Sequence, residues 1–238
     1  MPTSVHAGAL EAAQACAKRA LELLETATAG GRDATFAVSG GTTPKLMFEA
    51  LAAAGFNWSH VHLFFADERA VPPTDEQSNY KLAKENLIDA VGMPRRNVHR
   101  VHGELDADEA ARRYREELSE HFELKKGQLP IFDIVHCGMG PDGHMASLFP
   151  GDAHVEDRTG LAASVFAPKL PHWRVTLLPG VLLAASNALM LVTGADKADT
   201  LRAVVRDEYD PFVHPAQLMF HEHRNAMWFL DQAAAARL

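Results

Sequence analysis

Cysteine is scarce in this chain, which has only Cys16 and Cys137 among 238 residues. Two cysteines so far apart form no disulfide framework, and the histidines lack the cysteine clusters of zinc-binding motifs. Long apolar runs are missing too, since the longest candidate span, residues 181–192, is interrupted by Ser186 and Asn187. The N-terminal segment has no basic stretch followed by an apolar run, as a signal peptide would. We therefore expect a soluble protein of the cytoplasm.

Basic side chains are outnumbered, with 23 Lys and Arg against 31 Asp and Glu and a formal net charge of -8. Nucleic acids and anionic membranes are bound mainly through basic residues, so we expect neither as a partner. An anionic small molecule would need a local group of basic side chains. The hydrophobic content of 47% is enough for a large core, and we expect residues 1–238 to form one domain, as a monomer or a weak homo-oligomer.

Short apolar strands and helices alternate along the chain. The predicted helices span residues 7–29, 43–55, 78–92, 106–127 and 196–208. The predicted strands span residues 34–41, 61–67, 97–101, 131–137, 174–179, 188–194 and 226–231, with a further plausible strand at 161–166. Such an alternation indicates an α/β fold with a mainly parallel sheet covered on both faces.

Polar and glycine-rich segments follow several of these strands. They are SGGTTP at 39–44, DER at 67–69, GMGPDGH at 138–144 and TGADKA at 193–198. Open parallel sheets bind ligands beyond the carboxyl ends of their strands. We therefore expect these four segments to form one site.

The SGGTTP segment places small residues where a strand turns into a helix. The backbone N–H groups of Ser39, Gly40 and Gly41 and the hydroxyls of Thr42 and Thr43 are suited to bind an anion at the helix N-terminus. The Lys-Ser/Thr pair of a Walker motif is missing. The alternative is an ordinary tight turn with a threonine cap.

Arg69, Arg174 and Lys197 lie at or near the same strand ends. A guanidinium suits phosphate or carboxylate recognition, and Lys197 falls in the first turn of a predicted helix, where an ammonium group is unfavourable unless it meets an anion. For each of them alone, a solvated surface position is the default interpretation. Only their common neighbourhood favours a role in binding.

The segment at 138–151 contains the G-x-G-x-x-G spacing of dinucleotide-binding loops. Pro150 and Gly151 end the helix that should follow after less than two turns, so we expect no nicotinamide cofactor. His144 comes directly after the third glycine. Asp142 is placed to hold its imidazole in one tautomer, so that the other ring nitrogen can accept a proton. A histidine with a purely structural role is the alternative.

Two histidine pairs, His60 with His62 and His221 with His223, have a spacing that puts two imidazoles on one face of a strand. No third ligand is apparent for either pair. We therefore expect no metal site.

Together, SGGTTP, DERAVP with SN at 78–79, GMGPDGHMASLFPG, RVTL and DKA resemble the 6-phosphogluconolactonase family of the oxidative pentose phosphate pathway, from about residue 30 to the C-terminal WFLDQAAAA. The resemblance implies a modified Rossmann-like three-layer sandwich and hydrolysis of 6-phospho-D-glucono-1,5-lactone, without metal or cofactor. It implies water as the nucleophile, with His144 as general base oriented by Asp142. Phosphate and oxyanion contacts fall to residues 39–43, Arg69, Arg174 and Lys197, and their division stays open.

Glucosamine-6-phosphate deaminases share that fold and are the main alternative, with the patterns DEY and DGHIAFNEPG. In this chain Arg69 replaces the tyrosine, and Leu148 and Phe149 replace the asparagine and the glutamate that assists ring opening. These differences favour lactone hydrolysis. Within the lactonase pattern, Thr42 replaces the commoner serine and Met145 the commoner threonine. A sugar-phosphate sensor without catalytic activity is the second alternative.

Overall fold

The computed structural model describes residues 2–167 and 172–238, and a seven-stranded parallel sheet in the order β1-β10-β9-β6-β2-β3-β5 forms its centre. Its strands are β1 (Thr3–His6), β2 (Ala34–Val38), β3 (Val61–Phe65), β5 (Val98–His99), β6 (Ile134–Cys137), β9 (Ala188–Val192) and β10 (Ala226–Asp231). Every residue of β2, β6 and β9 is buried, as expected for parallel strands covered on both faces. The predicted fold class is confirmed.

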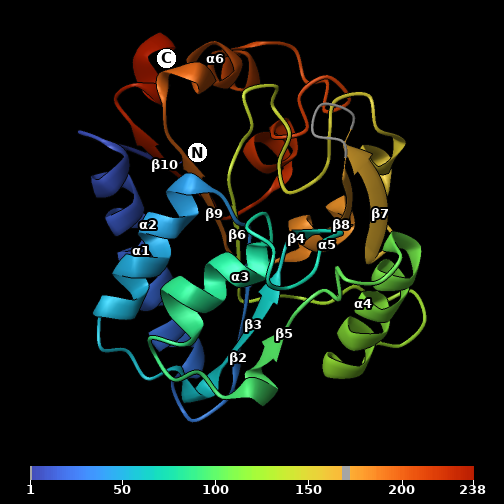
Figure 1. Cartoon of the computed structure of the whole chain (residues 1–238). Helices are drawn as coiled ribbons and strands as arrows, with labels where there is room; N and C mark the ends of the chain where they lie inside the picture. The colour runs from blue at the N-terminus through green and yellow to red at the C-terminus, as the bar shows by residue number, and fades with distance from the viewer. Residues whose placement is uncertain (1, 168–171) are drawn as a thin grey trace.

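Helices and a smaller sheet cover the two faces of this parallel sheet. The helices are α1 (Ala9–Thr28), α2 (Thr42–Ala53), α3 (Asn79–Ala83), α4 (Ala107–His121), α5 (Pro179–Ala184) and α6 (Ala198–Arg206). Figure 1 shows α1 and α2 along one side and α4 on the other, next to the smaller sheet. Helix α1 buries an apolar stripe that includes Cys16, Ala20 and Leu24, at helical spacing. Within the described residues, no helix is long and apolar enough to cross a membrane.

A separate antiparallel sheet, β4-β8-β7, was not predicted from the alternation of strands and helices. Its strands are β4 (Asp67–Arg69), β8 (His172–Leu177) and β7 (Ala162–Ala167). The predicted strand at 61–67 divides at Ala66, whose N–H donates to Val38 of the parallel sheet while its carbonyl accepts from Leu177 of β8. The chain therefore passes from one sheet to the other just before Asp67 and Arg69.

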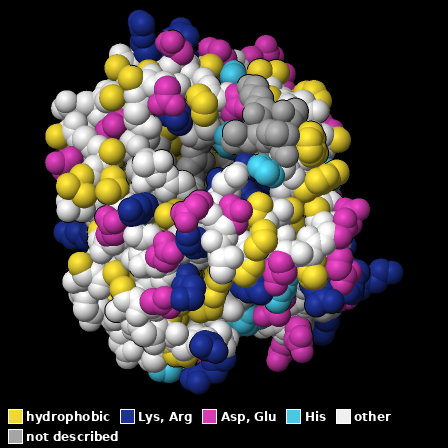
Figure 2. Space-filling model, in the orientation of Figure 1, with side chains coloured by type: hydrophobic (Ala, Val, Ile, Leu, Met, Phe, Trp, Pro, Cys, Tyr) yellow, Lys and Arg dark blue, Asp and Glu magenta, His cyan; other side chains and the backbone are white. Residues whose placement is uncertain are grey.

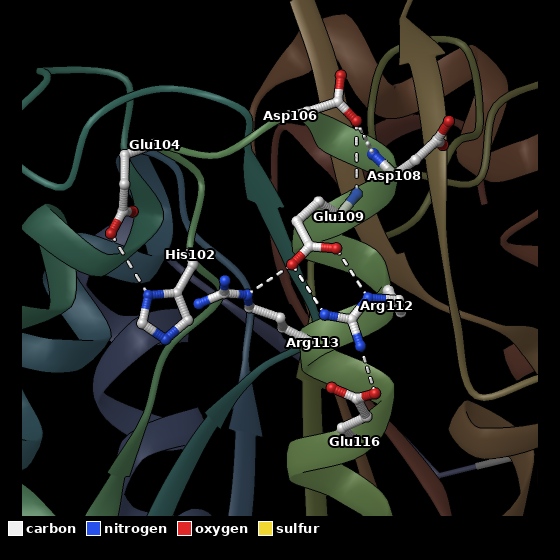
Figure 3. Close-up of polar contacts among 8 residues, drawn as sticks. All are labelled: His102, Glu104, Asp106, Asp108, Glu109, Arg112, Arg113 and Glu116. Carbon is white, nitrogen blue, oxygen red and sulfur yellow. Dashed lines mark hydrogen bonds and ion pairs between the residues drawn. The ribbon is translucent and has the colours of Figure 1, made fainter.

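Helix α4 is stabilised at its start and along its exposed face. The carboxylate of Asp106 accepts hydrogen bonds from the backbone N–H groups of Asp108 and Glu109, which caps the helix. Further along, Glu109 pairs with Arg112 and Arg113, and Arg112 also pairs with Glu116, as Figure 3 shows. The highly charged segment predicted as a helix at 106–127 therefore forms a helix over Ala107–His121, which ends six residues earlier than predicted and whose exposed charges pair with one another.

Strand β1 lies at the edge of the main sheet beside β10, and it was not predicted from the sequence. Its residues alternate between exposed and half-buried, and four residues are too few for a clear pattern. The interpretation of residues 1–238 as one domain stays a prediction.

Candidate active site

A cavity of about 320 Å³ opens at the carboxyl ends of the parallel strands. It is lined by all four polar segments that follow predicted strands and by β8. The lining residues are Ser39, Gly40, Gly41, Thr42, Thr43, Pro44, Asp67, Arg69, Gly138, Met139, Gly140, Pro141, His144, Ala146, Arg174, Leu191, Thr193 and Lys197. The cavity thus includes every predicted site residue except Asp142, whose carboxylate contacts the ring of His144.

The glycine turn after β2 brings backbone close to the loop that carries Asn79. A Cβ atom added to Gly40 would lie 2.0 Å from Oδ1 of Asn79, so any other residue there would force the Asn79 side chain to move. Gly41, with φ +128°, is the residue directly before α2, and no side chain caps the helix. The first N–H groups of α2 lack helical partners, so this turn can bind an anion beside the cavity.

Arg69 and Arg174 lie opposite each other on the antiparallel pair β4 and β8. Arg174 is buried, and burial, together with the charge of Arg69, lowers the pKa of its guanidinium. Nη1 of Arg69 donates to the carbonyl of Gln77 at 2.5 Å. Among the described residues, the Nε atom of each arginine has no hydrogen-bond partner. Two neighbouring guanidinium groups whose Nε–H groups have no partner create a local positive site in an acidic protein.

Glu68 holds the loop at 70–79 against this pair of arginines. Its buried carboxylate accepts hydrogen bonds from the backbone N–H groups of Arg69, Asn79 and Tyr80 and from the hydroxyl of Ser78, at 2.7–3.0 Å. Burial raises the pKa of Glu68, and these hydrogen bonds oppose that shift. The carboxylate therefore acts as the anchor of a loop that would otherwise be irregular.

His144 stands on a tight loop with its carboxylate partner two residues before it. Nδ1 of His144 lies 2.6 Å from Oδ1 of Asp142. A Cβ atom on Gly140 would lie 2.1 Å from the imidazole, and Gly143 has φ +86°. The glycines of the G-x-G-x-x-G spacing thus make room for a side chain and do not open a long helix. An ionised carboxylate only accepts, so Nδ1 carries the ring proton and Nε2 keeps its lone pair.

Lys197 reaches the cavity from the turn between β9 and α6. Its ammonium group pairs with Asp196, and the neighbouring turn is held by two hydrogen bonds of 3.1 Å from the N–H of Gly194 to the carboxylate of Asp231. The hydroxyls of Thr43 and Thr193 lie 2.6 Å apart. This contact joins the glycine turn after β2 to the turn after β9.

Sequence reasoning did not select Asp67, although it lines the cavity. Its buried carboxylate accepts a hydrogen bond of 2.8 Å from the hydroxyl of Ser147, and Nδ2 of Asn79 donates to it at 3.2 Å. The sequence feature that could have indicated Asp67 is an acidic residue directly after an apolar strand. Thr193 was also missed, because a single threonine after a strand has no distinctive pattern.

The expectation that neither histidine pair forms a metal site stays a prediction, but the structure brings His62 close to two histidines that the spacing does not reveal. The ring of His62 forms one group with His99 and His121, which come from distant parts of the sequence. His60 turns to Asp33 instead, with Nδ1 at 2.8 Å from Oδ1 of that carboxylate. In the part of the chain that the structure describes, His221 and His223 belong to no such group.

Charge is mixed on the face of the molecule shown in Figure 2. Figure 2 shows acidic and basic side chains interspersed on the face in view. The net charge of -8 is therefore compatible with a locally basic cavity.

Known proteins match almost the whole chain. Residues 8–228 match the family described as glucosamine-6-phosphate isomerases/6-phosphogluconolactonase. The chain is 35% identical to a 6-phosphogluconolactonase of Haemophilus influenzae, over 84% of this chain and 86% of that protein. It is 34% identical to a 6-phosphogluconolactonase of Homo sapiens, over 99% of this chain and 93% of that one. The solved 6-phosphogluconolactonase of Trypanosoma brucei aligns with a TM-score of 0.90 at 28% identity, covering 100% of this chain and 98% of that chain.

Proposed function

The chain belongs to the glucosamine-6-phosphate isomerase and 6-phosphogluconolactonase family, and we propose that it hydrolyses 6-phospho-D-glucono-1,5-lactone to 6-phosphogluconate in the pentose phosphate pathway. Relatives named 6-phosphogluconolactonase support this activity, since they share about a third of its residues over most of both chains. The observation that carries the proposal is the pair His144 and Asp142 beside a cavity lined by basic side chains.

Water is the nucleophile in the proposed reaction. Nε2 of His144 takes a proton from water, whose oxygen adds to the lactone carbonyl carbon. The bond from that carbon to the ring oxygen then breaks, and the imidazolium returns its proton to the departing oxygen. Asp142 keeps the ring in the tautomer with Nε2 unprotonated and stabilises the transient positive charge. No covalent intermediate with the protein is needed, and neither is a cofactor.

Two negative charges have to be stabilised, the phosphate of the substrate and the oxygen of the carbonyl as water adds. The candidates are the turn at 39–43, Arg69, Arg174 and Lys197. The neighbouring charge of Arg69 contributes to the lowered pKa of Arg174, and an anion bound between the two would relieve this repulsion. The arginines therefore favour an anionic substrate, and kinetics with altered substrates can divide the roles.

Ring opening of an amino-sugar phosphate is the competing activity within the family. The ring of Phe149 packs against that of His144, with centroids 4.8 Å apart. A phenyl ring transfers no proton, so this position lacks the carboxylate that the deaminase pattern supplies. Lactone hydrolysis needs no such group and is favoured.

The test is hydrolysis of freshly generated lactone, with the spontaneous rate subtracted. The chain offers a matched control in His154, whose Nδ1 lies 2.7 Å from Oδ1 of Asp152, again two residues before it. We expect the unmodified protein and His154→Gln to accelerate hydrolysis and His144→Gln to lose most of the acceleration. A protein that binds the lactone without accelerating its hydrolysis would be a sensor, which contradicts the proposal.

The proposed reaction requires only the sugar-phosphate lactone and water. We extend the proposal to a cytoplasmic protein that acts as a monomer or weak homo-oligomer, with no nucleic-acid or membrane partner. The net charge of -8 supports the exclusion of polyanions. Sedimentation analysis at micromolar concentration tests the oligomeric state.

A further inference from the structure

Three histidines from separate elements face one another on the main sheet. His62 lies on β3, His99 on β5 and His121 is the last residue of α4. A ring nitrogen from each lies within 4.8 Å of the others. Nδ1 of His62 and Nε2 of His99 are 2.8 Å apart, and the ring centroid of His121 is 4.7 Å from both of theirs.

This three-histidine cluster lies away from the proposed active site. His62 is the register partner of Thr35 on β2, whereas Ser39 reaches the cavity four residues further along the chain. That distance corresponds to about 13 Å along an extended strand. None of the three histidines lines the cavity. The cluster therefore has no role in the reaction proposed above.

Two carboxylates lie on the outer side of the cluster. Nδ1 of His99 donates to Oε1 of Glu117 at 2.5 Å, and Nε2 of His62 lies 3.6 Å from Oδ2 of Asp33. Metal-binding histidines usually donate their outer N–H to a carboxylate in this way, which turns the lone pair of the inner nitrogen toward the metal. Glu117 and Asp33 therefore lie where carboxylates usually accept hydrogen bonds from metal-binding histidines.

His62 cannot satisfy both of its neighbours as a neutral ring. Because His99 donates to Glu117, its Nε2 offers a lone pair to His62. If Nδ1 of His62 carries the proton and donates to His99, the lone pair of Nε2 faces the carboxylate of Asp33. If Nε2 carries the proton instead, the lone pairs of Nδ1 of His62 and Nε2 of His99 face each other. A cation between the inner nitrogens satisfies every contact.

We propose that His62, His99 and His121 bind a divalent transition-metal ion of the zinc class, with water as the fourth ligand. Imidazole nitrogens suit zinc, copper and nickel, whereas magnesium and calcium prefer oxygen ligands. Nitrogens at zinc's usual bond length in a tetrahedral site are about 3.4 Å apart. Metal binding would lengthen the 2.8 Å distance between Nδ1 of His62 and Nε2 of His99. It would shorten the longer distances between ligand nitrogens, which now reach up to 4.8 Å.

The surrounding charges favour a cation at the cluster. His121 ends α4, and the C-terminal end of a helix attracts positive charge. The carboxylates of Asp33 and Glu117 lie beside His62 and His99 and attract a cation, whereas the positive charge of Arg96 also acts on His62. A bound ion would join α4 to β3 and β5, so its expected effect is on stability.

The test uses the full-length chain without an affinity tag, stripped with chelator and titrated with zinc chloride by calorimetry. We expect one zinc ion per chain with a Kd below about 1 µM, and a Tm higher by about 5 °C at a hundredfold excess over Kd. Magnesium chloride should change neither. His121→Gln and His62→Gln should each weaken zinc binding by at least about tenfold. His154→Gln, which alters a half-exposed histidine beside a carboxylate, should bind as the unmodified chain does.

Cobalt(II) provides a second measurement on the unmodified chain, because tetrahedral coordination gives strong visible absorption that zinc should displace. This spectrum keeps the proposal testable if a histidine variant fails to fold. Zinc binding weaker than about 10 µM would overturn the proposal. So would an equal loss of affinity in His154→Gln, or retained affinity in both folded cluster variants.

Discussion

The active-site cavity and the three-histidine cluster place histidines beside carboxylates in two different ways. At the cavity, Nδ1 of His144 is hydrogen-bonded to Asp142, and Nε2 of the same ring is available beside basic side chains. In the cluster, His62 and His99 turn nitrogens toward each other and have carboxylates on their outer side. The first arrangement suits transfer of a proton, because one ring nitrogen keeps a lone pair on a histidine that lines the cavity. The second suits a metal ion, because several lone pairs converge.

The two regions also differ in how the sheet positions them. The cavity lies where several parallel strands end, so turns from distant parts of the chain meet there. The cluster lies on the face of β3 and β5, where His62 and Phe64 share one side of a strand and α4 covers them. The strand ends provide the backbone N–H groups of turns, whereas the covered face provides side chains packed between a strand and a helix. Experiments that alter one region should therefore leave the other intact.

The largest expected effect is on turnover in His144→Ala. We expect kcat to fall by about 100-fold to 10,000-fold, with KM within a few fold, because proton transfer is lost and the anion-binding groups remain. Steady-state kinetics on fresh lactone measures both constants. His121→Gln, in the cluster, should keep the kcat of the unmodified chain. A near-normal kcat in His144→Ala would refute the assignment of the base.

The next effect concerns the phosphate. Unphosphorylated glucono-1,5-lactone carries the same carbonyl, and its kcat/KM should be lower by about three orders of magnitude, since charge-assisted hydrogen bonds contribute roughly 1.5 to 3 kcal/mol each. Arg69→Ala should reproduce part of this loss with the phosphorylated lactone only. If both lactones slow equally in Arg69→Ala, the arginine stabilises the oxyanion. Comparable kcat/KM for the two lactones in the unmodified chain would exclude phosphate as the source of specificity.

A smaller effect is expected when the carboxylate partner of the base is changed. Asp142→Asn should lower kcat by about tenfold to 100-fold, a part of the general-base contribution, because an amide no longer favours the proton on Nδ1. Asp152→Asn is the matched control, since Asp152 holds His154 in the same local geometry outside the cavity. Equal kcat values in the two variants would mean that Asp142 does not orient the base.

The two regions were not equally predictable from the sequence. The cavity residues occur in short segments with distinctive composition, such as SGGTTP and GMGPDGH, so their positions at strand ends follow from the alternation of strands and helices. The alternation of strands and helices does not predict that Arg69 and Arg174 lie side by side in the cavity. They pair across an antiparallel sheet that the chain enters at Ala66.

The cluster has no local signal at all. His62, His99 and His121 are single residues on three elements, and only the register of β3 with β5 and the packing of α4 bring them together. The visible pairing of His60 with His62 was misleading, because His60 ends a short helical turn before the strand begins. The alternation predicted the parallel sheet, but it gave neither the register of its strands nor the second sheet.

His136 belongs to neither region. It therefore shows how burial alone changes the pKa of a histidine and the free energy of unfolding. It lies on β6 with no exposed surface, and burial lowers its pKa to about 3. Below its unfolded pKa of about 6.5, the unfolded chain gains a proton that the folded chain does not. The free energy of unfolding should therefore fall by about 1.4 kcal/mol per pH unit, or about 2 kcal/mol by pH 5.

Urea unfolding at pH 7 and pH 5 measures this loss. In His136→Met, which keeps an apolar side chain of similar size, the loss between the two pH values should be smaller by about 2 kcal/mol. Changes that arise from other titrating groups cancel in this difference. The same loss in both proteins would show that His136 takes up a proton without unfolding.

The smallest expected effect is that of metal removal on turnover. The proposed reaction uses water, an imidazole and basic groups, so prolonged chelation should leave kcat and KM unchanged. The same treatment should lower the Tm of zinc-loaded protein, because an ion bound only to the folded chain stabilises it by mass action. Turnover that is lost to chelator and restored by zinc would place a metal in the reaction and remove the distinction between the two regions. A Tm shift with unchanged turnover in the unmodified chain, and a smaller shift in His121→Gln, would separate them.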